Sequence, residues 1–204
     1  MTDDTIDAQI SALEQQIFGL NAELHELRKT RTGPEVANYR FAALTGETDL
    51  LSLFGEHEVL LVIHNMGQGC RYCTLWADGF NGFLPHLESA LAVVLVSKDA
   101  PELQRQFANA RGWRFQLASH GGGDYISEQS VMPGENNMPG AVVYQRHGDA
   151  IHRKNACVFG PGDQFCSLWN LLGLAGLSAA DWTPQFNYWR RPETLEDGGA
   201  NLLD

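Results

Sequence analysis

The sequence of 204 residues is poor in basic side chains, and this shortage limits the partners that the protein can have. It holds 14 lysine and arginine residues against 25 aspartate and glutamate residues, for a formal net charge of -11. Proteins that bind nucleic acid need a basic face that displaces counterions from phosphates, and no run of lysine and arginine supplies one here. We therefore expect no nucleic-acid partner.

Long hydrophobic runs are also missing. No segment approaches the length of about 20 uninterrupted apolar residues that a membrane-spanning helix requires. The opening residues, MTDDTIDAQI, are acidic and lack the apolar stretch of a secretory signal. We expect a cytoplasmic protein without a membrane partner. Its 44% hydrophobic and 19% charged residues are typical of a globular chain with a core of its own.

Cysteine is scarce as well, and the four cysteines present do not form a disulfide framework in a cytoplasmic chain. Two of them, Cys70 and Cys73, form a C-x-x-C pair, a spacing that is usually catalytic or metal-binding in such proteins. Cys157 and Cys166 are separated by eight residues and form no second pair, and the histidines show no i, i+4 spacing. We expect no metal site, and we expect Cys157 and Cys166 to be core residues.

Apolar patterns and turn residues predict alternating strands and helices. Continuous apolar runs predict buried strands at 58–65 and 91–97, followed by a helix broken around Gly79, Gly82 and Pro85 and by a helix at 100–113. Such an order implies a parallel pair with a right-handed crossover. The other expectations are a short strand, a turn and a short helix capped by Thr48 over 39–54, a surface loop over 114–138, a hairpin over 140–155 and a closing helix over 162–176.

Residues 1–33 are predicted to form an amphipathic dimerisation helix. Apolar residues recur at alternating steps of four and three, at Ile6, Ile10, Leu13, Ile17, Leu20, Leu24 and Leu27. This is a heptad seam with mostly isoleucine at a and leucine at d, which favours two parallel strands, and Glu23 at g can pair with Arg28 at e of a partner. We expect a homodimer through residues 6–27. The alternative is a helix that packs on its own domain.

The element order, with a C-x-x-C between the first core strand and its helix, is similar to the thioredoxin plan. The segments YRFAALTGETDLLSLFGEHEVLLVIHNMG, CRYCTLWADGFNG and ARGWRF, with the hairpin and closing helix, resemble a bacterial family of thioredoxin-like proteins of unknown function. The lead-in before the cysteines also resembles that of peroxiredoxins. The resemblance implies an α/β, thioredoxin-like fold over residues 34–190, with a central mixed β-sheet flanked by helices, and leaves a tail over 191–204.

The cysteine pair predicts thiol chemistry. If a helix begins near Cys70, its sulfur meets unpaired N–H groups and the positive end of the helix dipole, and both favour the reactive thiolate. Cys73 lies one turn further along the same face, where it can attack a mixed disulfide. We therefore expect a thiol–disulfide oxidoreductase with Cys70 as nucleophile and Cys73 as resolving residue. It would need no bound cofactor, and its partners would be a protein or small-molecule disulfide and a thiol reductant.

The resemblance also implies roles for residues around the pair. Pro139 takes the place of the cis-proline that faces the cysteines in thioredoxin-like folds, which would leave the Met138 backbone free to bind an extended substrate. Arg71 and Tyr72 lie between the cysteines and are expected to contact substrate. His64 stands where thioredoxins carry a buried carboxylate, six residues before the first cysteine, and is a candidate proton relay for Cys73. The alternatives are a trans-proline in a turn and a partly exposed histidine.

Two other functions stay open at this stage. A thiol-dependent peroxidase would follow the peroxiredoxin-like lead-in, but Gly67 stands where peroxiredoxins carry a threonine three residues before the reactive cysteine. A dimeric interaction or redox-sensing module without catalytic activity is the second alternative, since a fold does not determine a function. The pKa of Cys70 separates an enzyme from an inert scaffold.

Overall fold

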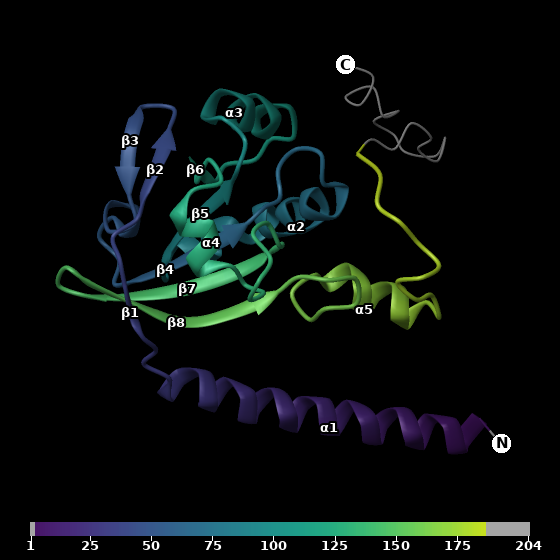
Figure 1. Cartoon of the computed structure of the whole chain (residues 1–204). Coiled ribbons are helices and arrows are strands. Elements are labelled where there is room, and N and C mark those ends of the chain that lie inside the picture. The colour runs from purple at the N-terminus through teal and green to yellow at the C-terminus, as the bar shows by residue number, and fades with distance from the viewer. Residues whose placement is uncertain (1–2, 187–204) are drawn as a thin grey trace.

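The computed structural model describes residues 3–186 and shows a mixed eight-stranded sheet with helices on both faces (Figure 1). The strands are β1 (Glu35–Val36), β2 (Arg40–Ala43), β3 (Gly46–Asp49), β4 (Val59–His64), β5 (Ala92–Ser97), β6 (Gln116–Ser119), β7 (Gly140–His147) and β8 (Ala150–Val158), in the spatial order β1-β8-β7-β4-β5-β6-β2-β3. The helices are α1 (Asp3–Thr30), α2 (Arg71–Glu88), α3 (Pro101–Ala110), α4 (Asp124–Gln129) and α5 (Ser167–Leu174), with a 3-10 turn at Ser52–Phe54.

The centre of the sheet is formed by the two apolar runs of the sequence. β4 and β5 pair in parallel, β6 continues the parallel part, and β7 pairs with β4 in the antiparallel direction. β4 and β5 are covered on both faces, which explains their continuous hydrophobic sequences. Because β4 and β5 run in the same direction, the loops that follow them, with Cys70 and Asp99, lie at one edge of the sheet.

Two hydrophobic clusters fill the two faces. Alternation along β4 places Leu60 and Val62 in one cluster, with Tyr125 of α4, and Ile63 in the other, with Trp76 of α2. The α2 face is rich in aromatic rings, and Trp76 stacks on Phe159 at 5.4 Å between centroids. α2 is thus fixed by its packing on the strand that precedes it.

The helix that follows the cysteines is broken by a kink, as the sequence predicts. The break is expected around Gly79, Gly82 and Pro85, and within Arg71–Glu88 the backbone leaves helical angles at Phe83 (φ -115°, ψ 15°). Pro85 has no N–H and its ring crowds the carbonyl one turn earlier, so the kink occurs just before it.

Two segments differ from the prediction. Thr48 lies in β3 opposite Phe41 and caps no helix; the Asp49 carboxylate accepts the Ser52 N–H at 2.8 Å instead. The expected surface loop over 114–138 contains β6 and α4, of four and six residues. Elements this short carry too few residues to show a periodicity in the sequence.

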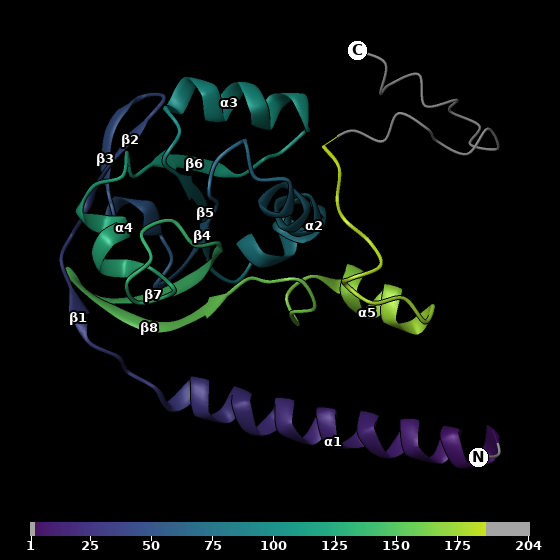
Figure 2. The ribbon, with the colours of Figure 1, turned by 45° about the vertical axis from the view of Figure 1, so that its right-hand side comes forward.

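α1 is confirmed as a helix, and it runs as a rod beside the domain in both ribbon views (Figures 1 and 2). The last turn of α1 contacts the domain: the Asn155 side-chain amide donates to the Arg28 carbonyl at 3.1 Å, and the Arg28 guanidinium lies 5.8 Å from the Phe165 ring centre. No helix within residues 3–186 combines the length and apolar character that crossing a bilayer demands. The expected tail over 191–204 lies outside the described residues.

Candidate active site

Cys70 occupies the N-cap position of α2. Its backbone is extended (φ -99°, ψ 102°), and its sulfur accepts a hydrogen bond from the Cys73 N–H at 3.1 Å. Its own N–H donates to the Gly67 carbonyl at 3.0 Å, which closes a turn just before the helix. The first turn of a helix has N–H groups without intrahelical partners, and here one of them is satisfied by the Cys70 sulfur.

The two thiols are pushed in opposite directions. The hydrogen bond from the Cys73 thiol and the N–H groups of Cys73 and Tyr72 lower the pKa of Cys70 to about 7, against the opposing effect of its partial burial. The same hydrogen bond to Cys70, together with burial, raises the pKa of Cys73 far above its ordinary value. Cys70 is half-buried and Cys73 is buried, and neither is in a disulfide. The accessible sulfur is thus the one that ionises near neutral pH.

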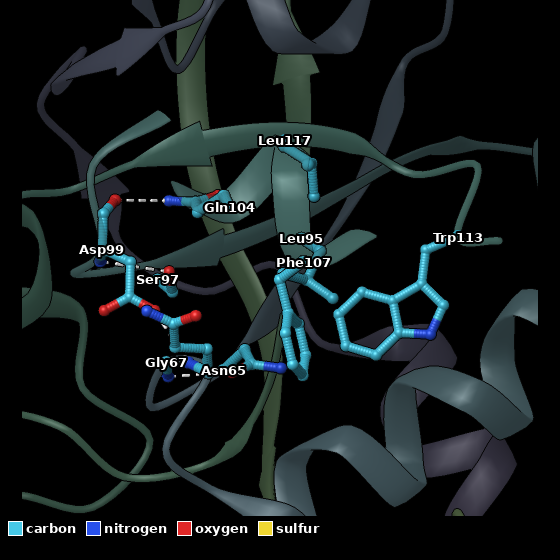
Figure 3. Close-up of a pocket in the computed structure, with 10 residues that line it drawn as sticks. Asn65, Gly67, Leu95, Ser97, Asp99, Gln104, Phe107, Trp113 and Leu117 are labelled. Carbon is cyan, nitrogen blue, oxygen red and sulfur yellow. Dashed lines mark hydrogen bonds between the residues drawn. The ribbon is translucent and has the colours of Figure 1, made fainter. Parts of the chain in front are cut away.

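The loop that carries Cys70 is held by side chains from two strand ends. The Asn65 amide oxygen accepts the Gly67 N–H at 2.8 Å, and the Asp99 carboxylate accepts the Gln68 N–H at 2.7 Å (Figure 3). Gly67 has φ +108°, and a Cβ there would lie 2.8 Å from the Asp99 carboxylate, so only glycine fits. Gln104 in turn donates from its amide to the Asp99 carbonyl at 2.8 Å.

A small cavity of about 20 Å³ lies behind this loop, between the polar residues and an apolar wall of Leu95, Phe107, Trp113 and Leu117 (Figure 3). It has room for about one water molecule. Neither cysteine lines this cavity, so it is not a pocket for a substrate of the cysteine pair.

Arg71 and Tyr72, between the cysteines, have different surroundings. Arg71 is exposed, whereas Tyr72 is half-buried with its ring 6.4 Å from Trp169 of α5 and 6.2 Å from Trp76. Tyr72 therefore joins the start of α2 to α5, and Arg71 is the one of the two that faces solvent.

Met138 and Pro139 lie at the same sheet edge as the cysteines. His64 pairs with Gly140, so the two residues before β7 run opposite the loop after β4, and the Asn137 amide donates to the Met66 carbonyl at 3.4 Å. Met66 is also the residue whose N–H donates to the Cys73 sulfur at 3.4 Å. Within residues 3–186 the backbone of Met138 makes no hydrogen bond.

The expectation of a cis-proline is wrong: residues 3–186 contain no cis peptide bond. The Pro139 carbonyl accepts the Phe159 N–H at 2.9 Å, which extends the pairing of β7 and β8 by one bond. The trans form of an X–Pro bond is favoured by about 0.5–1 kcal/mol, and nothing in this short entry to β7 requires the rarer form.

His64 does not lie with the cysteines. It points to the face of the sheet opposite α2, where its Nε2 is 2.7 Å from the Tyr125 hydroxyl and its Nδ1 is buried without a partner in the described part of the chain. Burial and the nearby His120 and Arg153 lower the pKa of His64 to about 3. Successive side chains of a strand point to opposite faces of the sheet. His64 therefore points away from the face on which its neighbour Ile63 packs under α2. The contacts of His64 therefore do not support the expected relay to Cys73.

The hydrogen bonds beyond His64 form a chain across this face. Within it, Tyr144 is 3.3 Å from Tyr125 and donates to Gln129 at 3.2 Å, Gln129 donates to Tyr39 at 3.0 Å, and Tyr39 donates to Glu128 at 2.5 Å. The chain satisfies buried polar groups and leads away from the cysteines.

The remaining cysteines lie elsewhere. Cys157 is half-buried in β8, and burial raises its pKa to about 11. Cys166 is buried at the start of α5, and burial raises its pKa as well. Among residues 3–186 no group of three or more His, Cys, Asp or Glu side chains is arranged to hold a metal ion.

Sequence reasoning missed the residues that position the cysteine loop. Asn65 and Asp99 follow the two central strands, and polar residues just after parallel strands are a usable signal because such strand ends meet at one edge of the sheet. Gly67, singled out only for lacking a hydroxyl, is the residue that lets Asp99 approach the loop.

Solved structures of thioredoxin-fold proteins are similar to this chain. Peroxidoxin BcpB from Mycobacterium tuberculosis has a TM-score of 0.52 at 19% identity, over 63% of this chain and 85% of that one. A mutant of peroxiredoxin Q from Xanthomonas campestris has a TM-score of 0.52 at 18% identity, over 67% and 88%. Reduced Prx3 from Vibrio vulnificus has a TM-score of 0.53 at 13% identity, over 71% and 97%. At such identities the similarity establishes the fold alone, and it confirms the expected thioredoxin-like fold.

Sequence comparison adds the family. No curated protein sequence shows significant similarity to the chain. A family model described as a bacterial protein of unknown function, DUF899, matches residues 12–194 and so includes part of α1, the whole sheet and the cysteine pair. The chain therefore belongs to the DUF899 family, a thioredoxin-like family of unknown function.

Proposed function

We propose that the protein is a thiol–disulfide oxidoreductase in which Cys70 is the nucleophile and Cys73 the resolving residue. The observation that carries this proposal is the N-cap geometry, in which an accessible sulfur receives the Cys73 N–H at 3.1 Å. A thiolate held in this way attacks disulfides, whereas the buried Cys73 keeps its proton.

In the first step the Cys70 thiolate attacks one sulfur of the substrate disulfide. The substrate S–S bond breaks, a mixed disulfide forms on Cys70, and the other substrate sulfur leaves as a thiolate. Met138 offers a free backbone N–H and carbonyl beside the cysteines, on which an extended substrate segment can pair. Arg71 is exposed next to Cys70 and can attract an acidic substrate group.

In the second step Cys73 attacks the Cys70 sulfur and releases the second substrate thiolate, which leaves a Cys70–Cys73 disulfide. The largest cause of the raised pKa of Cys73 is its hydrogen bond to Cys70, and that cause is lost once Cys70 carries substrate. The Met66 N–H, 3.4 Å away, still favours the Cys73 thiolate. The departing substrate thiolate can take the proton, so the step needs no histidine.

The lowered pKa of Cys70 supplies the thiolate that substrate reduction needs near neutral pH. A thiol reductant of the cell would return the Cys70–Cys73 disulfide to the two thiols. We place this reaction in the cytoplasm, where thiols are kept reduced.

A peroxide is the alternative substrate, because the thiolate that attacks a disulfide can also attack an O–O bond. Cys70 would become a sulfenic acid with release of hydroxide, and Cys73 would then displace water to give the same disulfide. The fold shared with peroxiredoxins motivates this alternative. Gly67 offers no hydroxyl to position a peroxide, so we rank it second.

The test compares both substrates on one reduced sample. We expect the protein to accelerate insulin reduction by dithiothreitol, and to react with hydrogen peroxide more slowly than with a small disulfide. Cys70→Ser removes the nucleophile and should abolish the acceleration. Cys157→Ser, a matched change at a half-buried cysteine away from a helix start, should keep it.

Insulin reduction no faster than with dithiothreitol alone would refute the oxidoreductase, as would full activity in Cys70→Ser. A peroxide reaction at least a hundredfold faster than the disulfide reaction would establish the peroxidase instead. Inactivity with both substrates would leave a scaffold without thiol catalysis.

A further inference from the structure

Within residues 3–186 the apolar seam of α1 has no cover. None of the helix residues is buried, and six of the seven seam residues are at least 40% exposed: Ile6, Ile10, Leu13, Ile17, Leu20 and Leu27. A single exposed leucine is ordinary, but a continuous apolar stripe on a 28-residue helix marks an interaction surface.

The domain covers only one flank of this helix. Asn21, Leu24 and Arg28 are half-buried, whereas their neighbours along the helix are exposed. Asn21 and Arg28 are e positions, and Leu24 is the adjoining a position. The a and d positions further toward the N-terminus project beyond the domain, so packing on the chain's own domain does not account for the seam.

A helix this long also needs a partner to be stable. It extends about 42 Å at 1.5 Å per residue, and the contacts of Asn155 and Phe165 with α1 are made at Arg28, in its last turn. Most helical stability in proteins comes from packing an apolar face rather than from intrinsic propensity. The exposed seam residues of the earlier turns therefore call for a second apolar surface.

We propose that this surface is the α1 helix of a second copy of the chain, in a parallel two-stranded coiled coil. Isoleucine occupies two a positions, Ile10 and Ile17, and leucine occupies the d positions Leu13, Leu20 and Leu27. This pattern favours a parallel coiled coil of two helices. In that register Glu23 at g faces Arg28 at e of the partner helix, and no like charges oppose each other at e and g. The pairing goes beyond the thiol chemistry and does not depend on it.

The surface area that two α1 seams can bury is that of a dimer which dissociates on dilution. Burying a leucine or isoleucine side chain removes roughly 60–120 Å² from water, so the seam residues of two helices bury on the order of 1,000 Å². A stable interface needs about 1,200 Å² or more. We therefore expect a monomer–dimer equilibrium that shifts toward the monomer on dilution.

The chain offers a matched pair of variants for the test. Ile17 and Phe18 are neighbours, both exposed, at 58% and 79%, but Ile17 lies on the seam and Phe18 lies off it. By sedimentation equilibrium we expect the full chain to approach twice its mass of 22.6 kDa, Ile17→Asp to remain a monomer, and Phe18→Asp to dimerise like the wild type. Insulin reduction should be the same in all three, since α1 does not contact the cysteines.

Orientation is tested by Leu13→Cys. In a parallel pair the two residues at position 13 face each other, and mild oxidation should give a dimer whose peptide map contains a link between residue 13 of both chains. In an antiparallel pair they are separated along the helices and do not link. A wild type that is monomeric at all concentrations, equal dimerisation of Ile17→Asp and Phe18→Asp, a trimer, or an antiparallel pair would each overturn the proposal.

Discussion

Among the helices of residues 3–186, α2 and α5 each have a cysteine at the N-cap, and the two cysteines differ in chemistry. Cys70 is the N-cap of α2, receives an N–H on its sulfur and has a pKa lowered to about 7. Cys166 is the N-cap of α5, and its side chain makes no capping hydrogen bond. Burial raises the pKa of Cys166, and the nearby Asp163 carboxylate adds to the rise.

The difference lies in how burial compares with the hydrogen bonds at each sulfur. The N–H groups of Leu168 and Trp169, in the first turn of α5, lower the pKa of Cys166, but burial outweighs them. The Asp163 carboxylate, which accepts the N–H of Phe165 at 2.7 Å and of Cys166 at 3.1 Å, adds a negative charge near this sulfur. At Cys70 the hydrogen bonds from the Cys73 thiol and from first-turn N–H groups outweigh burial. A helix start alone therefore does not activate a cysteine.

The largest expected effect is a difference in the rate of insulin reduction between variants of these two cysteines. Cys70→Ala removes the attacking sulfur and should lower the rate of insulin reduction by a factor of about 1,000 or more, because no other thiol ionises near neutral pH. Cys166→Ala, the same change at the other helix start, should leave the rate within about twofold and lower thermal stability modestly. A large loss of rate in folded Cys166→Ala would remove the distinction between the two termini.

We expect the ionisation of His64, on the face of the sheet opposite α2, to affect the stability of the fold and not the proton transfer of Cys73. The pKa of His64 is lowered from 6.5 to about 3, so below pH 6.5 the unfolded chain binds a proton that the folded chain does not. Its contribution to stability is complete above pH 6.5 and is lost as the pH falls toward 3. From pH 7 to pH 5 the loss from this group is about 2 kcal/mol.

We expect His64→Phe to flatten the pH dependence of the free energy of unfolding by about that amount, measured by urea titration at several pH values. The pH profile of thiol exchange should be unchanged in the same variant. A shifted profile would restore the proton relay that the contacts of His64 do not support.

The smallest effect concerns Asp163. Asp163→Asn keeps a carbonyl oxygen as acceptor but removes the charge, and we expect the free energy of unfolding to fall by about 1 kcal/mol or less. Alkylation of Cys166, followed by mass spectrometry, should stay much slower than that of Cys70, since burial is the main cause of its raised pKa. Equal alkylation of both cysteines would show that the carboxylate alone keeps Cys166 unreactive.

The sheet was predictable where its strands are continuously apolar. β4, β5, α3 and the β7–β8 hairpin lie where the sequence predicts them, because burial on two faces imposes long apolar runs and turns carry glycine. β3, β6 and α4 were missed because they are short and half-polar. Of the three, β6 is also paired with a strand distant in sequence, β2, which no local pattern predicts.

At the site, the cysteine pair and its helix start were predictable from spacing alone. The supports were not: Asn65 and Asp99 meet the cysteine loop only because β4 and β5 run in parallel to one edge. His64 was misjudged for a related reason, since a residue's distance from the cysteines in sequence does not give the face of the strand to which it points.

The most direct test of the central claim is the rate of Cys70 alkylation as a function of pH, with each cysteine peptide quantified by mass spectrometry. The N-cap geometry predicts a midpoint near pH 7 in the wild type. It predicts a higher midpoint in Cys73→Ala, which loses the thiol hydrogen bond but keeps the backbone N–H. A wild-type midpoint near 9, the ordinary value for a thiol, would contradict the proposed activation of Cys70.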